Sequence, residues 1–288
     1  MKAAEFDYER PASLDAACDL LARHGDAKII AGGQTLVPLL AMRLAKPALL
    51  IDINRIAELQ GIARNDGFVA IRACTRQADT LAHAAVRSDV PLLAKALRFV
   101  GHGQTRNRGT VGGSLANADP AAEIGLAALA LDAGVRARST RGERTIALDK
   151  FFVGAMETAL AADECLVEAR FPVWRGRIGT GFQEVSARAS DFAFLAAAAQ
   201  VELDAGGVVK RVAVSVGGAS TMPLRMKMCE ARLLGTRLDA RDIEEAAALA
   251  AQSLQPVADP HASPRYRCRV ACALAARALA EARDEALA

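Results

Sequence analysis

The residues best placed to do chemistry lie in two short glycine segments. The first is Ala31-Gly32-Gly33-Gln34-Thr35-Leu36-Val37-Pro38, which follows a predicted strand and opens a predicted helix. Glycines let the backbone approach a ligand closely, and the amides at a helix start suit an anion such as a pyrophosphate. Thr35 can add a hydroxyl donor, and Pro38 loses no hydrogen bond if it lies in the first helical turn. This segment is therefore a candidate phosphate site.

The second segment offers the same groups over a longer stretch. It reads Arg106-Asn107-Arg108-Gly109-Thr110-Val111-Gly112-Gly113-Ser114-Leu115-Ala116-Asn117-Ala118-Asp119-Pro120, with glycines, amides and small hydroxyl side chains. Neither segment matches GxGxxG or GxxxxGK[ST], so nicotinamide-type and P-loop sites have no support. A single Gly-Gly after a strand is most often just a turn. Two such segments, each beside Ser or Thr, favour a dinucleotide held from two sides.

Composition argues against several other kinds of site. The net charge is +3 over 288 residues, and Lys and Arg are scattered among Asp and Glu, which argues against nucleic-acid binding. The six cysteines lack the clustering of an iron–sulfur protein and the four histidines lack metal-ligand spacing. No catalytic triad is evident, so we expect neither catalytic nor metal-binding residues. The N-terminus lacks a signal core and no run is long enough to span a membrane, which predicts a cytoplasmic protein.

The elements that must position the two segments form a mixed pattern. The length favours two domains, and a change of composition near 171–176 places them at 1–175 and 176–288. Helices and strands mix without a regular βαβ rhythm, which predicts an α+β fold. Helices are expected at 13–24, after 33 up to about 44, and at 75–84, 91–100, 120–131, 239–253 and 266–288. Strands are expected at 28–31, 48–53, 68–73, 135–139, 144–148, 165–171, 180–187, 193–203 and 208–216, and Asp119 is expected to cap the helix beginning at Pro120.

The sequence resembles the FAD-binding medium subunits of the molybdenum hydroxylases, a group that includes aerobic carbon monoxide dehydrogenases and xanthine dehydrogenases. AGGQTLVP is similar to the first flavin motif of that family, and RNRGTVGGSLANADPAAE is similar to the second. The opening FDYERPASLDAACDLL, the FPVW at the boundary, SDFAFLAAA and Tyr266-Arg267 are also typical of it. The resemblance covers the full length.

The resemblance implies a fold and a set of cofactor contacts. The fold would be a p-cresol methylhydroxylase-type FAD-binding domain of two α+β lobes, followed by a small C-terminal domain with a short antiparallel sheet and helices. The implied FAD contacts form two runs, with Glu123 and Leu166 as further flavin contacts. The first run is Ile30, Ala31, Gly32, Gly33, Gln34, Thr35 and Leu36, and the second is Thr110, Val111, Gly112, Gly113 and Ser114.

The same resemblance implies partners. A large subunit would hold the molybdenum-pterin cofactor and hydroxylate the substrate, and a small subunit with two [2Fe–2S] clusters would relay electrons. The FAD of this chain would pass them to an external acceptor, in a dimer of heterotrimers. The acceptor stays open, and so does the substrate among carbon monoxide, an aldehyde and an N-heterocycle. The departure of 186–193 from the carbon monoxide enzymes favours an organic substrate.

Two residues depart from the family pattern. Gln34 stands where many members have His, and Phe194 stands where xanthine-oxidising members have a Lys near the flavin. The second departure argues against an animal-type xanthine enzyme and against NAD reduction. Two alternatives remain: a stand-alone FAD reductase or oxidase of the same fold, for which Ser215 and Ser220 are available, and a flavin-free scaffold subunit.

Overall fold

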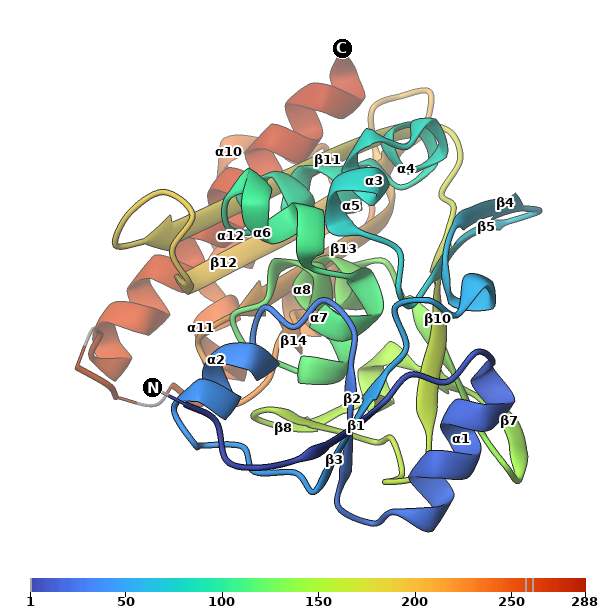
Figure 1. Cartoon of the computed structure of the whole chain (residues 1–288). Helices are drawn as coiled ribbons and strands as arrows, with labels where there is room; N and C mark the ends of the chain where they lie inside the picture. The colour runs from blue at the N-terminus through green and yellow to red at the C-terminus, as the bar shows by residue number, and fades with distance from the viewer. Residues whose placement is uncertain (1, 257, 261) are drawn as a thin grey trace.

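The N-terminal lobe is a small parallel sheet flanked by two helices (Figure 1). The computed structural model describes residues 2–256, 258–260 and 262–288. The strand order is β1-β3-β2, with β1 at Asp7–Glu9, β2 at Ala27–Ile30 and β3 at Leu49–Asp52. Helix α1 (Leu14–Arg23) is capped by Ser13, whose Oγ accepts from the amide of Ala16, and α2 is Leu36–Ala41. The lobe thus presents the turn between β2 and α2 at one edge of its sheet.

The second lobe is a five-stranded sheet with six short helices. Its strand order is β4-β5-β10-β6-β7, and all pairs are antiparallel. The strands are β4 (Ile62–Asn65), β5 (Phe68–Arg72), β6 (Gly134–Ser139), β7 (Gly142–Ala147) and β10 (Cys165–Pro172), and a hairpin joins β8 (Phe152–Gly154) to β9 (Glu157–Thr158). The helices are α3 (Gln77–Ala82), α4 (Ala84–Asp89), α5 (Pro91–Phe99), α6 (Gly103–Arg108), α7 (Val111–Asn117) and α8 (Glu123–Ala130). Strand β10 is the central strand of this sheet, because it pairs with β5 on one side and with β6 on the other.

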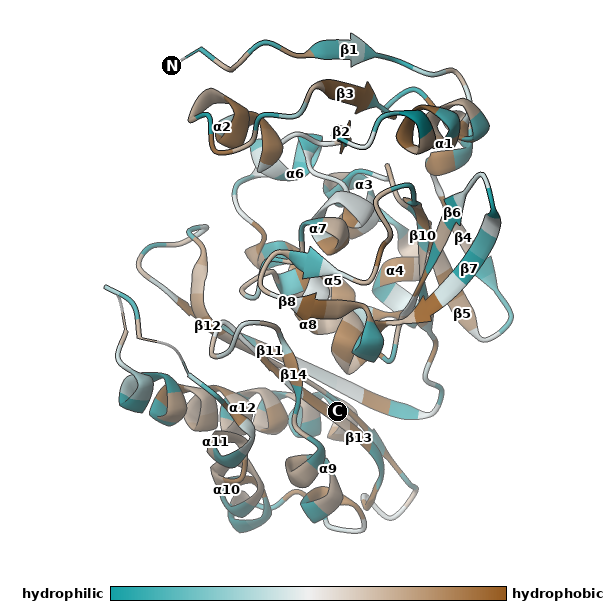
Figure 2. Ribbon diagram, turned by 90° about the horizontal axis from the view of Figure 1, so that it is seen from below, coloured by the Kyte–Doolittle hydropathy of each residue, from teal (hydrophilic) through white to brown (hydrophobic). Residues whose placement is uncertain are grey.

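The C-terminal part is an antiparallel sheet between two helical layers (Figure 2). Its strands are β11 (Arg177–Ser186), β12 (Ala193–Leu203), β13 (Val209–Gly217) and β14 (Leu224–Arg225). Its helices are α9 (Lys227–Leu233), α10 (Ala240–Ala248), α11 (Ala250–Ser253) and α12 (Pro264–Leu287). A Cβ at Gly179 or Gly181 would fall on the main chain of α12, so these glycines let β11 and α12 pack backbone to backbone. The opposite face of the sheet rests on α5 and α8.

Polar contacts join this sheet to the second lobe. The Ser215 hydroxyl donates to the Leu126 carbonyl at 3.1 Å, and the amide of Gly218 donates to the Pro120 carbonyl at 2.9 Å. The Lys95 ammonium reaches from α5 to the Thr180 carbonyl at 2.6 Å and to the carboxylates of Glu281 and Glu285 at 2.8 and 3.1 Å. The start of α8 is therefore fixed against the C-terminal sheet.

The α+β class predicted from the sequence is confirmed, and most strands lie within two residues of their predicted positions. Several details were wrong. No helix was expected between residues 100 and 120, but this stretch contains α6 and α7. Asp119 does not cap α8, which begins at Glu123; its Oδ1 instead accepts from the amide of Ala121 at 2.9 Å in the preceding turn. Across the described ranges, no helix is long and apolar enough to cross a bilayer.

Candidate functional site

The two glycine segments touch each other in the folded chain, although about 75 residues separate them in the sequence. A Cβ added at Gly32 would lie 2.6 Å from the Arg108 carbonyl oxygen and 2.8 Å from Gly109 Cα. Real Cβ atoms do not approach other atoms this closely, so only glycine fits here. The contact brings the β2–α2 turn against the α6–α7 turn.

The backbone amides of the first segment are open. Among the hydrogen bonds of the described residues, none uses the amides of Gly32, Gly33, Gln34 or Thr35 as donors. Gly33 has a φ of 71°, the left-handed region that glycine adopts without strain. Pro38 is the third residue of α2, so its missing amide costs no helical hydrogen bond, as predicted. Since α2 has only six residues, the open amides rather than a helix dipole would attract an anion.

The amides of residues 111–114 in the second segment are already used, contrary to the expectation that this segment offers its amides to a ligand. Those of Val111 and Gly112 donate to the carbonyls of Thr75 and Ala73. Those of Gly113 and Ser114 donate to the hydroxyl and the carbonyl of Thr110, which is the N-cap of α7. Gly112 lies so close to Ala73 that a Cβ would be 2.6 Å from its Cα. Within the described chain the hydroxyl of Ser114 has no partner, and it remains a polar group available to a ligand.

Two residues that sequence reasoning missed connect the segments. Asn54, just after β3, donates through Nδ2 to the Ala31 carbonyl at 2.7 Å. Arg76, just before α3, donates through Nη2 to Asn54 Oδ1 at 2.8 Å and through Nη1 to the Arg108 carbonyl at 2.5 Å. Gln77, the next residue, faces Gly109 so closely that a Cβ there would lie 2.5 Å from its Oε1. The only sequence feature that pointed to these two residues was Asp52, a polar residue in an otherwise apolar predicted strand two positions before Asn54.

Two carboxyl groups lie near the start of α8. Burial raises the pKa of Glu123 to about 7, and the negative charge of Asp119 adds to the shift. Burial and, to a smaller extent, the charge of Glu123 raise the pKa of Glu184, on β11, to about 8. Glu184 Oε2 is buried and has no hydrogen-bond partner in the described part of the protein. A carboxyl that keeps its proton near neutral pH can donate a hydrogen bond as well as accept one.

The remaining residues from the sequence have plainer surroundings. Leu166, on β10, is 5% exposed and shares a hydrophobic core with Val111, Leu115 and Ile124. Phe194 is partly buried at the start of β12, and its carbonyl accepts from Arg267 at 2.8 Å. Ser215, one of the two serines available to a stand-alone reductase, is fully buried and its hydroxyl donates to the Leu126 carbonyl. A catalytic role for Ser215 is therefore unsupported.

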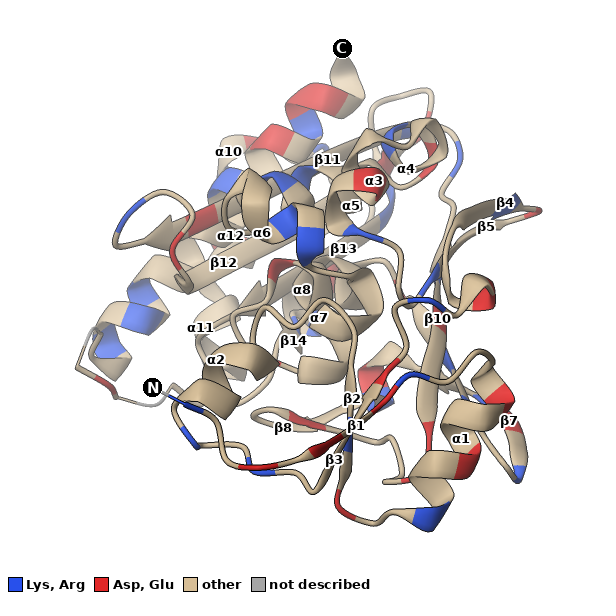
Figure 3. Cartoon of the chain, viewed as in Figure 1, with Lys and Arg blue, Asp and Glu red and all other residues tan. Residues whose placement is uncertain are grey.

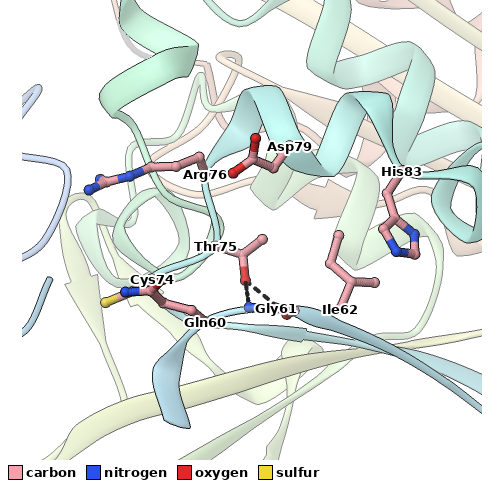
Figure 4. Close-up of a pocket in the computed structure, with 8 residues that line it drawn as sticks. All are labelled: Gln60, Gly61, Ile62, Cys74, Thr75, Arg76, Asp79 and His83. Atoms are coloured by element: carbon pink, nitrogen blue, oxygen red, sulfur yellow. Dashed lines mark hydrogen bonds between the residues drawn. The ribbon is translucent and has the colours of Figure 1, made fainter. Parts of the chain in front are cut away.

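A cavity of about 200 Å³ lies beside Arg76, between β4 and α3. Figure 4 shows the Arg76 side chain directed away from Asp79 and His83, which line the same cavity. The Thr75 hydroxyl donates to the Gly61 carbonyl and accepts from the Gly61 amide, at 2.9 and 3.0 Å. The Arg76 guanidinium is thus committed to the glycine segments and not to this cavity.

Neither the charged residues nor the cysteines of the described chain indicate a second functional site. Basic and acidic residues are intermixed along the chain, as the blue and red segments of Figure 3 show. All six cysteines are free thiols. The described residues contain no group of three or more His, Cys, Asp or Glu side chains that could hold a metal ion.

The amino-acid sequence matches two family descriptions over nearly its whole length. Residues 4–174 match the "FAD binding domain in molybdopterin dehydrogenase", and residues 180–282 match the "CO dehydrogenase flavoprotein C-terminal domain". The chain belongs to this flavoprotein family. It therefore has an FAD-binding domain of the kind that the sequence motifs predicted.

Relatives of this flavoprotein family are similar along their whole length. Subunit alpha of the 6-hydroxypseudooxynicotine dehydrogenase complex of Paenarthrobacter nicotinovorans is 42% identical, covering 98% of this chain and 96% of the relative. Caffeine dehydrogenase subunit beta of Pseudomonas sp. strain CBB1 is 37% identical, covering 99% and 97%. A chain of the solved quinoline 2-oxidoreductase of Pseudomonas putida 86 superposes with a TM-score of 0.95 at 34% identity, covering 100% of both. A chain of carbon monoxide dehydrogenase from Hydrogenophaga pseudoflava gives 0.96 at 33%, covering 99% of both.

Proposed function

We propose that this chain is the FAD-binding electron-transfer subunit of a molybdenum hydroxylase complex. The observation that carries the proposal is the contact between Gly32 and the turn at Arg108 and Gly109, beside the open amides of the first segment. This arrangement fits the diphosphate of a dinucleotide, because amide donors face an anion where no side chain intervenes. The two matched family regions support a division into domains at 1–175 and 176–288.

We propose distinct tasks for the two segments. Residues 30–36 would hold the diphosphate through main-chain amides. In the second segment the amides of residues 111–114 are occupied, so the hydroxyls of Thr110 and Ser114 would contact the cofactor. Gly112 and Gly113 would let α7 lie close enough to Ala73 and Thr110 to place these hydroxyls. Glu123 would contact the flavin as a hydrogen-bonding carboxyl, and Leu166 as an apolar surface. FAD, when bound, would supply the capacity to accept and release electrons, and the chain itself would bind and orient it.

The proposed assembly assigns the substrate chemistry to other chains. A large subunit would carry the molybdenum-pterin cofactor and a small subunit two [2Fe–2S] clusters, arranged as a dimer of heterotrimers. Such a division is consistent with the names of the relatives, which are subunits or medium chains of dehydrogenases. It requires no acid, base or nucleophile in this chain.

We propose an N-heterocyclic substrate for the complex. Relatives named for nicotine, caffeine and a hydroxylated nicotine derivative are 37–42% identical to this chain, whereas the carbon monoxide dehydrogenase medium chains are 32–33% identical. Reduction of bound FAD in the assembled complex by a pyridine or purine, and not by carbon monoxide, is the expected result. Reduction by carbon monoxide alone would overturn the substrate class and leave the FAD role intact.

The FAD role is tested by the absorption spectrum of the purified chain and mass identification of the cofactor released by acid. We expect one non-covalent FAD per chain. Gly32→Ala should weaken FAD binding at least about tenfold, because the added Cβ would meet the Arg108 carbonyl at 2.6 Å and force the segments apart. Gly25→Ala is the control, since a Cβ there meets nothing within 4 Å. A colourless chain that does not take up added FAD would contradict the proposal and favour a scaffold role.

A further inference from the structure

The side chains of Asn54 and Arg76 form one continuous connection between the two glycine segments, which we name the Asn54–Arg76 bridge. It runs from the Ala31 carbonyl through Asn54 and Arg76 to the Arg108 carbonyl. We propose that this bridge positions the two segments and so sets the affinity of the chain for the diphosphate of FAD. The proposal rests on the proposed FAD site, and it assigns a role to two residues outside both glycine motifs.

The orientation of the Asn54 amide is determined by its neighbours. Its Nδ2 donates both to the Ala31 carbonyl and to Asp52 Oδ1, each at 2.7 Å. Both partners are acceptors only, so the nitrogen must face them and Oδ1 must face Arg76. Aspartate has the same shape but cannot donate. At this position it would put a second carboxylate against Asp52 and against the Ala31 carbonyl.

Asp52 is held as a charged anchor for this arrangement. Burial raises its pKa, but hydrogen bonds from Tyr8 and Asn54 outweigh burial, so the pKa lies below its usual value. Its Oδ2 accepts from the Tyr8 hydroxyl, and Arg10 lies 3.4 Å away. The ionised carboxylate therefore fixes Asn54 from the side of the N-terminal sheet, through both the amide and the side chain of Asn54.

Arg76 fixes the other side with a geometry that only an arginine provides. Its two Nη atoms reach different acceptors, the Asn54 side chain and the Arg108 carbonyl, and lysine has no comparable planar fork. The backbone of Arg76 also pairs with Thr110 in an isolated antiparallel bridge. Arg76 thus determines where both ends of the α6–α7 turn lie.

The bridge also affects the binding of an anion such as a diphosphate through electrostatics. The Arg108 carbonyl oxygen lies against Gly32, beside the open amides, and an uncompensated carbonyl dipole there would repel a diphosphate. The hydrogen bond from Arg76 places the positively charged guanidinium next to that oxygen. It therefore offsets the repulsion as well as holding the segments in contact.

The experiment measures FAD and ADP affinities of the full chain stripped of flavin, by titration, together with its melting temperature without ligand. The variants are Asn54→Asp, Arg76→Met and Arg76→Lys, and Arg55→Met is the control because Arg55 is an exposed neighbouring arginine with no ion pair among the described residues. We expect each bridge variant to weaken binding at least about tenfold. Within each variant the factor should be the same for FAD and for ADP, because the two ligands share the diphosphate. Arg55→Met should bind FAD and ADP within about twofold of the wild type. The melting temperatures of the Arg76 and Arg55 variants should be similar, and Asn54→Asp should melt at a lower temperature because its new carboxylate lies against Asp52.

Other outcomes distinguish this inference from the FAD assignment. Wild-type affinity in Asn54→Asp, or in Arg76→Lys, would overturn the bridge, since the first keeps the shape and the second keeps the charge. If the loss of affinity parallels a loss of melting temperature in every variant, Asn54 and Arg76 support the fold in general and do not specifically position the two segments. A wild-type chain that binds neither FAD nor ADP would overturn the FAD site itself and the bridge with it.

Discussion

Single carboxyl groups decide how the site responds to pH. Glu123 and Glu184 come from α8 and β11. Burial raises the pKa of both groups; the charge of Glu123 adds to the shift at Glu184, and the charge of Asp119 adds to the shift at Glu123. The Glu184 Oε2 atom has no partner within the described residues, so nothing offsets the cost of ionising it. The neutral form of this pair is consequently the form that the fold prefers.

Glu184→Gln should change the pH dependence of stability in the flavin-free chain. The pKa of Glu184 rises from 4.5 to about 8 on folding, so the folded state binds more protons than the unfolded state between these values. The free energy of unfolding of the wild type should therefore fall as pH rises from 4.5 to 8. In Glu184→Gln this decline should be smaller, as measured by urea unfolding at pH 5.5 and 8.5.

The control for this experiment is Glu245→Gln. Glu245 is an exposed carboxyl whose pKa is lowered by hydrogen bonds from Arg241 and Arg232, so its titration lies below the tested range. Its removal should leave the difference between pH 5.5 and 8.5 unchanged. An identical slope in wild type and Glu184→Gln would show that Glu184 is already ionised in the folded chain.

At the scale of the elements, α7 is a helix that its own sequence hardly supports. Val111–Asn117 contains two glycines in its first three residues, and glycine costs about 1 kcal/mol in a helix relative to alanine. The Thr110 hydroxyl accepts from Gly113 and offsets part of this cost. The packing of Gly112 against Ala73, which a larger residue would prevent, explains why the glycines are there.

Thr110→Ala should lower the free energy of unfolding by about 1 kcal/mol, because α7 loses its N-cap. Thr110→Ser retains the hydroxyl and should keep most of the stability. Chemical denaturation of both variants measures the effect, and FAD titration should show weaker binding in Thr110→Ala. Equal stability of the alanine and serine variants would mean that the cap contributes little to α7.

Local patterns predicted the elements whose signals lie within a few residues. Examples are the helix expected at 13–24, the strands expected at 135–139 and 144–148 and the long strand expected at 193–203, which the structure contains as α1, β6, β7 and β12. The short helices α6 and α7 were missed, because tertiary packing overrides the low helix propensity of their glycines. The motifs located the two segments, but the contact of Gly32 with Arg108 and the Asn54–Arg76 bridge depend on residues that only the folded chain brings together.

At the scale of the whole molecule, Lys95 connects the second lobe to the C-terminal sheet and its last helix. Its ammonium contacts β11 and two carboxylates of α12. Burial raises the pKa of Glu285, but hydrogen bonds from Thr180 and Lys95 outweigh it and hold that pKa below its usual value. The cluster keeps α5 beside the strand that carries Glu184.

Lys95→Met should lower the free energy of unfolding by about 1–2 kcal/mol, less than a fully buried ion pair would cost because all three side chains are partly solvated. Lys210→Met is the matched control. It breaks one ion pair, between an exposed lysine and the buried Glu202, and should cost less than Lys95→Met because Lys210 is mostly solvated. Equal losses in the two variants, measured by urea unfolding, would argue against Lys95 as a connection between the parts.

The backbone contact of α12 with Gly179 and Gly181 has a consequence for biosynthesis. The ribosome makes β11 about 80 residues before the helix that covers it. Until α12 emerges, the apolar face of the sheet has no partner, whereas the strands of the two N-terminal lobes are already complete at Pro172. Nascent chains that stall in this interval would expose that face to chaperones or to one another, so translation speed through 187–287 should influence the yield of soluble protein.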